Sequence, residues 1–351
     1  MTTLNRLSDL PQWDYDDIID VRSQSEFAED HIPGAINLPV LSDAERAIVG
    51  KIYVQDDRFK ARKVGAALVA RNAADHIETA LGAKGGAWRP LVHCWRGGQR
   101  SGSFASILAQ IGWRVELLDG GYKAYRRLVS NALYKQPVQH RLILLDGNTG
   151  TAKTDILKLL EKSGVQVLDL EGMAAHRGSL FGAVSAPQPT QKLFEGHLAM
   201  QLSKMDSSRP VLVEAESNKI GNILIPTSFW KAMIAAPRIT IKAPLQARSD
   251  YLLRSYADLL QNEVLLRERI AKLGFFHSKD QITQWLQCVD AGQFQDLAAG
   301  LMQRHYDPRY AKTYKKRDHV ELGTVALDAL DANTLQTIAV PQICSLIDKS
   351  V

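Results

Sequence analysis

One cysteine lies in a loop whose residues would activate a thiol. The loop runs from His93 to Ser101, between an apolar strand over residues 90–92 and a helix expected over residues 103–111. Glycines let backbone N–H groups turn inward, and the helix start and two arginines add positive charge that favours the reactive thiolate. The alternative is a buried structural cysteine before a turn, but such a cysteine normally has apolar neighbours. We therefore predict Cys94 as a nucleophile in an anion-binding loop with Trp95, Arg96, Gly97, Gly98 and Arg100.

A second glycine loop follows a buried strand over residues 141–146 and precedes a helix over residues 155–162. This arrangement resembles a Walker A P-loop, in which backbone N–H groups surround a phosphate, the lysine reaches terminal oxygens and the Thr hydroxyl could bind Mg²⁺. Ala152 stands where the pattern has glycine, and its methyl group would crowd the phosphate path. Phosphate binding is therefore favoured over nucleotide hydrolysis, and over a chance glycine turn. The predicted phosphate-binding residues are Gly147, Asn148, Thr149, Gly150, Lys153 and Thr154.

Downstream, a polar and glycine-broken stretch over residues 169–182 is typical of a functional loop. Its residues His176, Arg177 and Ser179 would contact an anionic substrate, although a lone histidine is more often a surface or hydrogen-bonded residue. A strand over residues 210–217 contains Glu214 and Glu216 near its end. Either carboxylate could hold Mg²⁺ through a bound water, and both could equally be solvated positions at a strand end.

A basic segment lies near the C-terminus. Residues 303–317 contain six cations and one acid, with tyrosines between the charges and a helix start at Asp307-Pro308. Such a segment could be a solvated helix face, but aromatic rings among cations also suit single-stranded RNA, where bases stack and phosphates pair. The predicted RNA contacts are Arg309, Lys312, Lys315, Lys316 and Arg317.

Length and composition narrow the class of protein. The 351 residues are enough for two or three domains, and the net charge of +5 mildly favours a polyanionic partner. The three cysteines have no disulfide or zinc spacing, which fits a reducing cytoplasm. The sequence starts without an apolar signal core and has no run approaching the roughly 18 apolar residues that cross a bilayer. We expect a cytoplasmic protein with no membrane anchor, no bound metal and no tightly bound cofactor.

Strands that alternate with helices position these loops. Strands are expected over residues 18–22, 35–38, 91–93 and 114–118, with helical stretches over 43–82, 103–111 and 122–133 between or after them. Further strands are expected over 165–169 and 238–241, and the chain becomes mainly helical after residue 244. This order predicts α/β domains with parallel sheets, whose ligands gather at the carboxyl ends of the strands. The predicted domains are residues 1–135, residues 136–245 with the P-loop, and a mainly helical region 246–351 with the basic segment 303–317.

Four short motifs in the N-terminal domain resemble a rhodanese domain. They are Asp20-Val21-Arg22, the stretch over residues 31–39, the Cys94 loop and Leu118-Asp119-Gly120-Gly121. The resemblance implies that the cysteine carries a chalcogen atom as a persulfide. The seven residues from Cys94 to Arg100 exceed the six usual in simple sulfurtransferases and also fit the tyrosine-phosphatase signature. A phosphatase or a sulfurtransferase on the rhodanese fold is therefore an alternative.

The order of rhodanese domain, P-loop NTPase-like domain and basic helical region resembles the tRNA 2-selenouridine synthases. The matching motifs are residues 94–98, 148–150, 169–172, 176–179 and 214–217. The resemblance implies a transferase that replaces sulfur by selenium in 2-thiouridine at the tRNA wobble position, with selenophosphate as donor. It also implies an S-geranyl intermediate made from geranyl diphosphate, whose diphosphate the P-loop would hold. A P-loop kinase with a degenerate rhodanese module is a further alternative, which ATP turnover would reveal.

Overall fold

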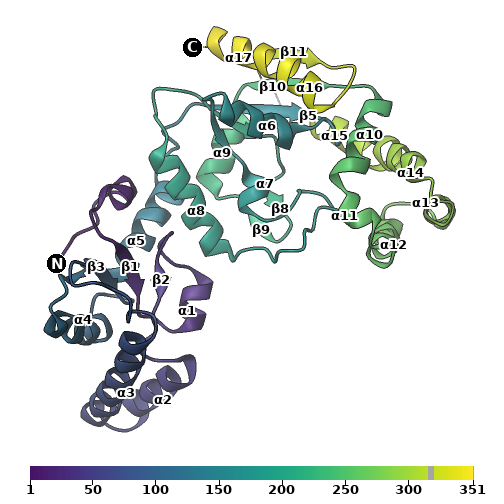
Figure 1. Cartoon of the computed structure of the whole chain (residues 1–351). Coiled ribbons are helices and arrows are strands. Elements are labelled where there is room, and N and C mark those ends of the chain that lie inside the picture. The colour runs from purple at the N-terminus through teal and green to yellow at the C-terminus, as the bar shows by residue number, and fades with distance from the viewer. Residues whose placement is uncertain (315–319, 351) are drawn as a thin grey trace. The chain divides into compact units, whose positions relative to one another are not determined.

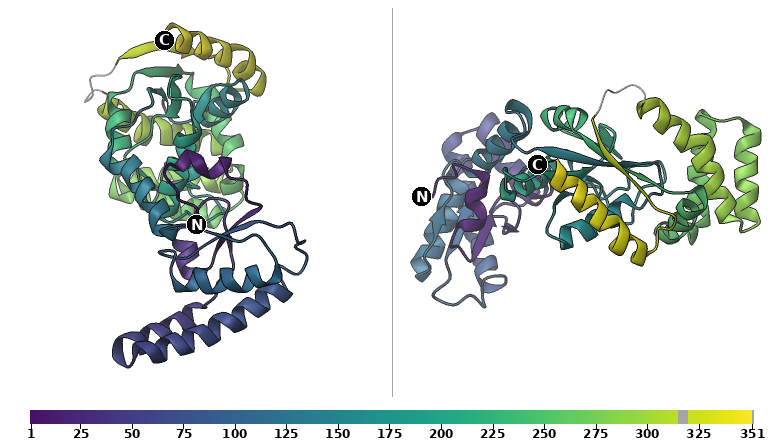
Figure 2. Two further views of the ribbon diagram at one scale, coloured as in Figure 1. Left: turned by 90° about the vertical axis from the view of Figure 1, so that its left-hand side faces the viewer. Right: turned by 90° about the horizontal axis from the view of Figure 1, so that it is seen from above.

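The computed structural model describes residues 1–314 and 320–350, which form two compact units (Figure 1, Figure 2). The N-terminal unit comprises Met1–Gln136 together with Pro189–Lys204, and the C-terminal unit comprises Pro137–Gln188 together with Met205–Val351. Within the described ranges, no helix is long and apolar enough to cross a membrane.

The N-terminal unit is built on a sheet with the strand order β2-β1-β3-β4, in which each described pairing is parallel. Its apolar strand residues, such as Ile19 and Val92, are fully buried. The core joins α3 and α4 to the sheet, and α2 lies beside α3 as a helical pair (Figure 2). The elements of this unit are η1 (Leu7–Gln12), β1 (Asp17–Asp20), α1 (Gln24–Glu29), β2 (Ile36–Asn37), α2 (Asp43–Gln55), α3 (Arg58–Glu78), β3 (Pro90–His93), α4 (Gln99–Ile111), β4 (Glu116–Leu117), α5 (Gly121–Ser130), η2 (Asn131–Lys135) and α8 (Gln191–Lys204).

The C-terminal unit is built on a second parallel sheet with the order β11-β10-β5-β7-β6. Helices α6 and α17 pack with β5, β10 and β11 in one apolar cluster (Figure 1), and α9 contacts β5. The elements are β5 (Leu142–Gly147), α6 (Lys153–Lys162), β6 (Gln166–Leu168), α7 (Leu170–Met173), β7 (Val211–Glu214), β8 (Lys219–Ile220), β9 (Ile223–Leu224), α9 (Thr227–Ala235), β10 (Arg238–Lys242), α10 (Leu245–Ser255), α11 (Ala257–Leu260), α12 (Glu263–Lys272), η3 (Leu273–Phe275), α13 (Lys279–Asp290), α14 (Phe294–Leu301), η4 (Met302–Tyr306), α15 (Asp307–Tyr314), β11 (Glu321–Ala326), α16 (Ala332–Thr334), η5 (Leu335–Ala339) and α17 (Val340–Lys349).

Helices α11 to α14 and the short turn η3 have an apolar cluster of their own. Trp285 and Leu266 are buried in this cluster, and Cys288 packs against it, as expected for a core-filling cysteine. The α/β class with parallel sheets and a helical C-terminal region is confirmed. The sequence did not predict β11, which extends the second sheet, or α8, which lies in the sequence between β6 and β7 yet packs in the N-terminal unit.

Candidate functional sites

Cys94 lies at the carboxyl end of β3, and α4 begins five residues later. Its side chain is buried. The sulfur accepts a hydrogen bond from the backbone N–H of Gly98 (3.3 Å) and another from the Ser101 hydroxyl (3.2 Å). The loop therefore surrounds the sulfur with donors, as the residue types predict for an anion site.

The balance of burial and hydrogen bonding determines the state of this thiol. Burial alone would raise the pKa of Cys94, but hydrogen bonds from Ser101 and from backbone N–H groups of the loop outweigh it and lower the pKa. Arg100 forms an ion pair with Glu26 (2.7 Å), so its charge is shared with a carboxylate. Ser101 and Glu26 were not among the predicted site residues. Ser101 could have been found from the sequence, because it lies on the first turn of the helix that follows the cysteine loop. Glu26 could not, because it lies 74 positions away from its partner Arg100.

Glycines hold the Cys94 loop against the segment that follows β4. A Cβ atom on Gly97 would lie 2.9 Å from the carbonyl oxygen of Leu118, and one on Gly121 would lie 2.4 Å from that of Cys94. Both glycines have positive φ. The Tyr122 N–H also donates to the Cys94 carbonyl oxygen (2.9 Å). The motif at residues 118–121 is therefore the backbone partner of the cysteine loop.

A buried ion pair supports the same loop. Arg22 contacts Asp20 (2.6 Å) and donates to the carbonyl oxygen of Asp30 (2.6 Å), and its guanidinium lies 3.8 Å from the centre of the Tyr122 ring. The indole of Trp95, which is 36% exposed, lies beside that ring at 5.1 Å. Removing one member of the buried Asp20–Arg22 pair would leave an unpaired charge, so this pair is a fixed support for the loop. Trp95 beside it stays partly accessible.

The P-loop connects β5 to α6 in the C-terminal unit. Gly147 and Gly150 adopt φ of 150° and 83°, which glycine allows without steric cost. Ala152 also has positive φ, at 59°, a left-handed conformation that costs about 1–2 kcal/mol in a residue with a Cβ. Its methyl group packs in the apolar cluster beneath the sheet and is 2% exposed. The methyl group is therefore held by the core, while Ala152 also lines the cavity beside the P-loop, so its effect on the phosphate path stays a prediction.

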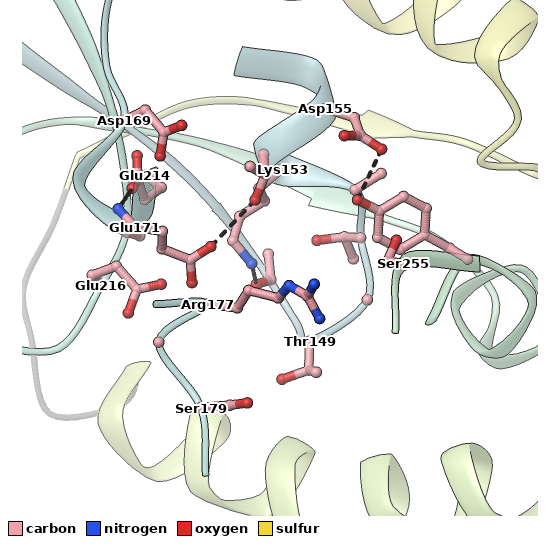
Figure 3. A pocket seen from close by; sticks show the side chains of 18 of the residues that line it. Thr149, Lys153, Asp155, Asp169, Glu171, Arg177, Ser179, Glu214, Glu216 and Ser255 are labelled. Carbon is pink, nitrogen blue, oxygen red and sulfur yellow. Dashed lines mark hydrogen bonds between the residues drawn. The ribbon is translucent and has the colours of Figure 1, made fainter. Parts of the chain in front are cut away.

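Lys153 lies at the start of α6 and faces a large cavity. Its ammonium donates to the Gly147 carbonyl oxygen (2.8 Å), and the Thr154 hydroxyl donates to a carboxylate oxygen of Glu171 (3.3 Å). The cavity has a volume of about 1340 Å³. Figure 3 shows Lys153, Glu171 and Glu216 converging on it. The cavity is lined by the predicted residues Gly147, Thr149, Gly150, Lys153, Thr154, His176, Arg177, Ser179, Glu214 and Glu216, but Asn148 is not part of its lining.

Three carboxyl groups lie beside the lysine, and one of them, Glu171, was not predicted. A Cβ atom on Gly178 would come within 2.7 Å of an oxygen of Glu171 and of Glu216, so these two carboxyl groups lie against the same glycine. Burial, followed by the charge of Glu216, raises the pKa of Glu171 to about 8. Glu214 is buried and accepts a hydrogen bond from the Glu171 backbone N–H (2.7 Å). The Glu171 and Glu216 pair therefore holds a proton near neutral pH.

The polar loop over residues 169–182 lies along the same cavity. Arg177 forms an ion pair with Asp258 (3.1 Å), and its guanidinium lies 4.8 Å from the centre of the Tyr256 ring. Burial lowers the pKa of His176, with a smaller effect from the charge of Arg269. Within the part of the chain that the structure describes, the Nδ1 atom of His176 has no hydrogen-bond partner. His176 is therefore held neutral at the edge of the cavity, next to an arginine that is already paired.

Another arginine in the cavity wall was not predicted. Arg238, on β10, pairs with Asp146, which also accepts a hydrogen bond from the Tyr310 hydroxyl. Arg238 is 5% exposed and lines the cavity, and its Nε and Nη2 atoms have no hydrogen-bond partner among residues 1–314 and 320–350. Arg248 donates to the Thr149 carbonyl oxygen (2.8 Å) and fixes the outer side of the P-loop. Local patterns could not reveal these contacts, because each joins segments far apart in sequence.

The predicted RNA-contacting segment is only partly described. Arg309 lines the P-loop cavity, and Lys312 is exposed on the same helix, α15, which begins at Asp307 as predicted. Three of the predicted contacts, Lys315, Lys316 and Arg317, lie outside the described residues. Among the described residues, no group of three or more His, Cys, Asp or Glu side chains is arranged to hold a metal ion.

A parallel sheet with an activated cysteine loop and a second sheet with a P-loop define a rhodanese-like protein fused to a phosphate-binding α/β domain. Family models agree, since the rhodanese-like domain matches residues 2–128 and the tRNA 2-selenouridine synthase AAA domain matches residues 140–291. Proteins named tRNA 2-selenouridine synthase from Hahella chejuensis and Shewanella oneidensis are 31% and 33% identical over 86% of this chain, and the alignments cover 86% and 87% of those proteins. The chain therefore belongs to the tRNA 2-selenouridine synthase family.

The match to some relatives is shorter. The tRNA 2-selenouridine synthase of Nitrosomonas europaea is 36% identical over 243 residues, which are 68% of this chain and 63% of that protein. The aligned part of this chain thus spans less than two thirds of that relative's length. The predicted family, with its rhodanese and P-loop domains, is confirmed.

Proposed function

We propose that this protein converts wobble 2-thiouridine in tRNA to 2-selenouridine in two steps, one at each anion loop. In the first, the thiouridine sulfur attacks C1 of geranyl diphosphate, the C–O bond breaks, diphosphate leaves with the bonding electrons and the base loses its N3 proton. In the second, the Cys94 thiolate attacks phosphorus of selenophosphate, the P–Se bond breaks and selenium leaves as hydrogen selenide. The selenide attacks C2, the C2–S bond breaks, geranyl thiol leaves and N3 regains its proton. Water then cleaves the S-phosphocysteine to release inorganic phosphate. The tRNA and the selenium chemistry are supported by the names of the relatives.

One observation carries the first step, namely an apolar cavity directly beside the P-loop cavity. Thirteen of its fifteen lining residues are apolar or aromatic, including Leu259, Leu266 and Leu297. The two cavities share five lining residues, which are Thr149, Ser179, Leu252, Tyr256 and Tyr306. A cationic, glycine-rich site that opens onto an apolar one fits a molecule with a diphosphate at one end and a short hydrocarbon chain at the other.

The polar cavity has donors suited to the diphosphate. Lys153 and the unpaired guanidinium nitrogens of Arg238 would bind its oxygens, and positive charge there stabilises the negative charge that develops on the leaving group. Mg²⁺ fits the same place, because Thr154 and the Glu171 and Glu216 carboxyl groups supply the oxygen ligands that this ion prefers alongside phosphates. When bound, Mg²⁺ would neutralise charge on the diphosphate and replace the proton that the carboxyl pair holds.

The second step is assigned to Cys94. Its lowered pKa and the inward donors of the loop suit a nucleophile that takes the phosphoryl group of selenophosphate and releases its selenium as selenide. The donors lie close around one sulfur, so a small tetrahedral anion such as selenophosphate is the ligand that fits.

The test is mass spectrometry of nucleosides from 2-thiouridine tRNA after incubation with the protein. With geranyl diphosphate alone, S-geranyl-2-thiouridine should form, and adding selenophosphate should give 2-selenouridine. Unchanged 2-thiouridine in both reactions would overturn the proposal. Turnover of ATP would then favour a kinase, and hydrolysis of an aryl phosphate by Cys94 would favour a phosphatase.

The prenyl assignment has its own test in Ala298→Phe, which fills the apolar cavity from a position in α14. The larger side chain should weaken binding of geranyl diphosphate tenfold or more while leaving binding of inorganic diphosphate unchanged, because only the hydrocarbon needs that cavity. Gln293→Leu, at the exposed N-cap position of the same helix, serves as the matched control. Equal weakening of both ligands would show that the apolar cavity does not bind the chain.

A further inference from the structure

Two adjacent phenylalanines are exposed at the end of α12. Phe275 is 89% exposed and Phe276 is 56% exposed, whereas their neighbour Leu273 is buried and completes the local core. Gly274, between them and that core residue, has open space where a Cβ would stand. Single exposed apolar residues are ordinary, but here two consecutive aromatic side chains are both exposed.

This surface is joined to the P-loop cavity by one arginine. The Arg309 guanidinium lies 4.0 Å from the centre of the Phe276 ring, and the same arginine lines the cavity. His305, one helical turn before Arg309, lies 5.7 Å from the Phe276 ring. Lys312 follows Arg309 by three residues on α15 and is exposed, so it lies on the same side of that helix as Arg309.

The chemistry of this surface fits an unpaired nucleobase with its phosphates. Aromatic side chains and arginine planes stack on unpaired bases, and nearby cations pair with the backbone. A uridine whose sulfur is to reach a ligand in a cavity must also leave its base stack, which leaves its neighbour without a stacking partner.

We propose that Phe275, Phe276 and Arg309 form an aromatic platform that stacks an unpaired tRNA base next to the nucleotide being modified. The proposal rests on the proposed function for its substrate. It commits to RNA because the Arg309 guanidinium lies over the Phe276 ring and exposed Lys312 follows on the same helix, and a purely apolar partner would not require this positive charge.

The experiment measures the affinity of the full-length protein for two RNA probes. One is an anticodon stem-loop with 2-thiouridine, and the other is a hairpin of equal length whose bases are paired. Phe275→Ala with Phe276→Ala should weaken stem-loop binding by about 5- to 150-fold, as expected for loss of one stacked base. Duplex binding and the salt dependence of the stem-loop affinity should not change, because no phosphate contact is lost.

Three further variants separate stacking from apolar contact and from general loss of an aromatic ring. Phe275→Trp should retain affinity and Phe275→Leu should lose it, since only the former keeps a π face. Phe59→Ala in the N-terminal unit is the matched control, because Phe59 is 62% exposed and has the Lys63 ammonium 5.5 Å from its ring; it should leave stem-loop binding unchanged.

The platform is overturned if the double variant binds the stem-loop as tightly as the parent, or if it loses duplex binding equally. A parent dimer in sedimentation that the double variant abolishes would assign the rings to a second copy of the chain instead. If the parent binds the stem-loop but converts no 2-thiouridine, and the double variant loses that binding, the proposed function fails and the platform stands.

Discussion

The two anion loops share one topology and differ in how their charge is balanced. Each connects the carboxyl end of a buried parallel strand to a helix start, β3 to α4 for Cys94 and β5 to α6 for Lys153. The Cys94 sulfur is buried and takes its hydrogen bonds from its own loop. Lys153 instead faces a cavity of about 1340 Å³ with the carboxyl groups of Glu171 and Glu216 beside it.

This difference indicates what each loop can hold. Donors packed around a single atom suit a reactive group and one small anion, so the Cys94 loop resembles a binding site for one tetrahedral ion. A wide site with a cation, two carboxyl groups and an apolar neighbour suits a larger substrate that carries its own charge. The same strand–loop–helix geometry therefore supports nucleophilic chemistry in one unit and leaving-group stabilisation in the other.

The largest expected effects come from replacing the reactive side chain of each loop, because each replacement should stop or slow a different reaction. Cys94→Ala should abolish selenium incorporation while S-geranyl tRNA accumulates, because the nucleophile is lost and the P-loop is untouched. Lys153→Ala should slow geranylation by about 10²–10³-fold, the typical cost of losing one group that stabilises transition-state charge. Both products are measured by nucleoside mass spectrometry.

The control is tRNA that already carries the S-geranyl group, which should restore selenation by the Lys153→Ala protein. If Cys94→Ala stops geranylation as fully as Lys153→Ala does, with both proteins folded and binding tRNA, the assignment of one step to each loop is wrong.

A smaller effect tests what activates Cys94. Ser101→Ala should raise the pKa of the thiol, because a hydrogen bond to the charged form is lost, and should slow alkylation near pH 7 by about tenfold or more, since such bonds are worth about 1.5–3 kcal/mol. Arg100→Ala should slow it less, because Glu26 already pairs with that arginine. Rates of Cys94 alkylation by a small reagent, compared between the two variants, test which substitution has the larger effect.

Ser106→Ala, at an exposed position on the same helix, is the matched control for this comparison. A larger effect of Arg100→Ala than of Ser101→Ala would mean that side-chain charge, and not the inward donors, activates the thiol.

The acidic pair gives a pH dependence of stability opposite in sign to that of the Cys94 thiol, whose pKa is lowered. Because the pKa of Glu171 is raised from 4.5 to about 8 on folding, the folded state binds more protons between these values. The free energy of unfolding should therefore fall as pH rises through this window, by at most about 1.4 kcal/mol per pH unit for one proton. Glu171→Gln should flatten that slope in denaturant titrations from pH 5 to 8, whereas Glu161→Gln, at an exposed position of α6, should not. An unchanged slope would show that the pair does not share a proton.

The smallest effect concerns Ala152. Replacing it by glycine relieves left-handed strain of about 1–2 kcal/mol but loses a buried methyl group worth about 0.8 kcal/mol and adds chain entropy of about 0.5–1 kcal/mol. Stability should change by less than about 1 kcal/mol, and diphosphate binding should not change. Ala175→Gly, also at positive φ but only half-buried, should stabilise more. A marked gain in diphosphate affinity for Ala152→Gly would show that the methyl group crowds the phosphate path.

Features carried by contiguous residues were predictable from the sequence. Both loops, their strands and their helices follow from local patterns of apolar, glycine and charged residues, and so does the parallel topology. The partners of those loops were not predictable, because Glu26, Arg238 and Arg248 reach them from segments far away in the chain. The roles of the predicted site residues in substrate binding and catalysis stay predictions.

Two elements illustrate the limit of pattern reasoning. β11 has a glycine and mixed burial, so its sequence lacks a clear strand period, and its pairing with β10 comes from the rest of the sheet. α8 buries residues on several faces, including Phe194, Glu195 and Gly196. A helix buried in this way has no polar stripe to show which unit it belongs to.

The placement of α8 also affects how the chain is made. Arg126 and Tyr134 in the N-terminal unit bind Glu195 of α8, and Tyr125 packs against Gly196. Pro189, which begins this second segment, is synthesised 53 residues after Gln136 (189 − 136). At about 5–20 residues per second, the first unit waits several seconds on the ribosome for its last helix, while the strand and P-loop of the second unit have already been made. Folding of the cysteine domain is thus tied to synthesis of the phosphate-binding domain. All strands of the N-terminal sheet are made first, but this unit lacks α8 until the ribosome has passed β5, the P-loop and β6.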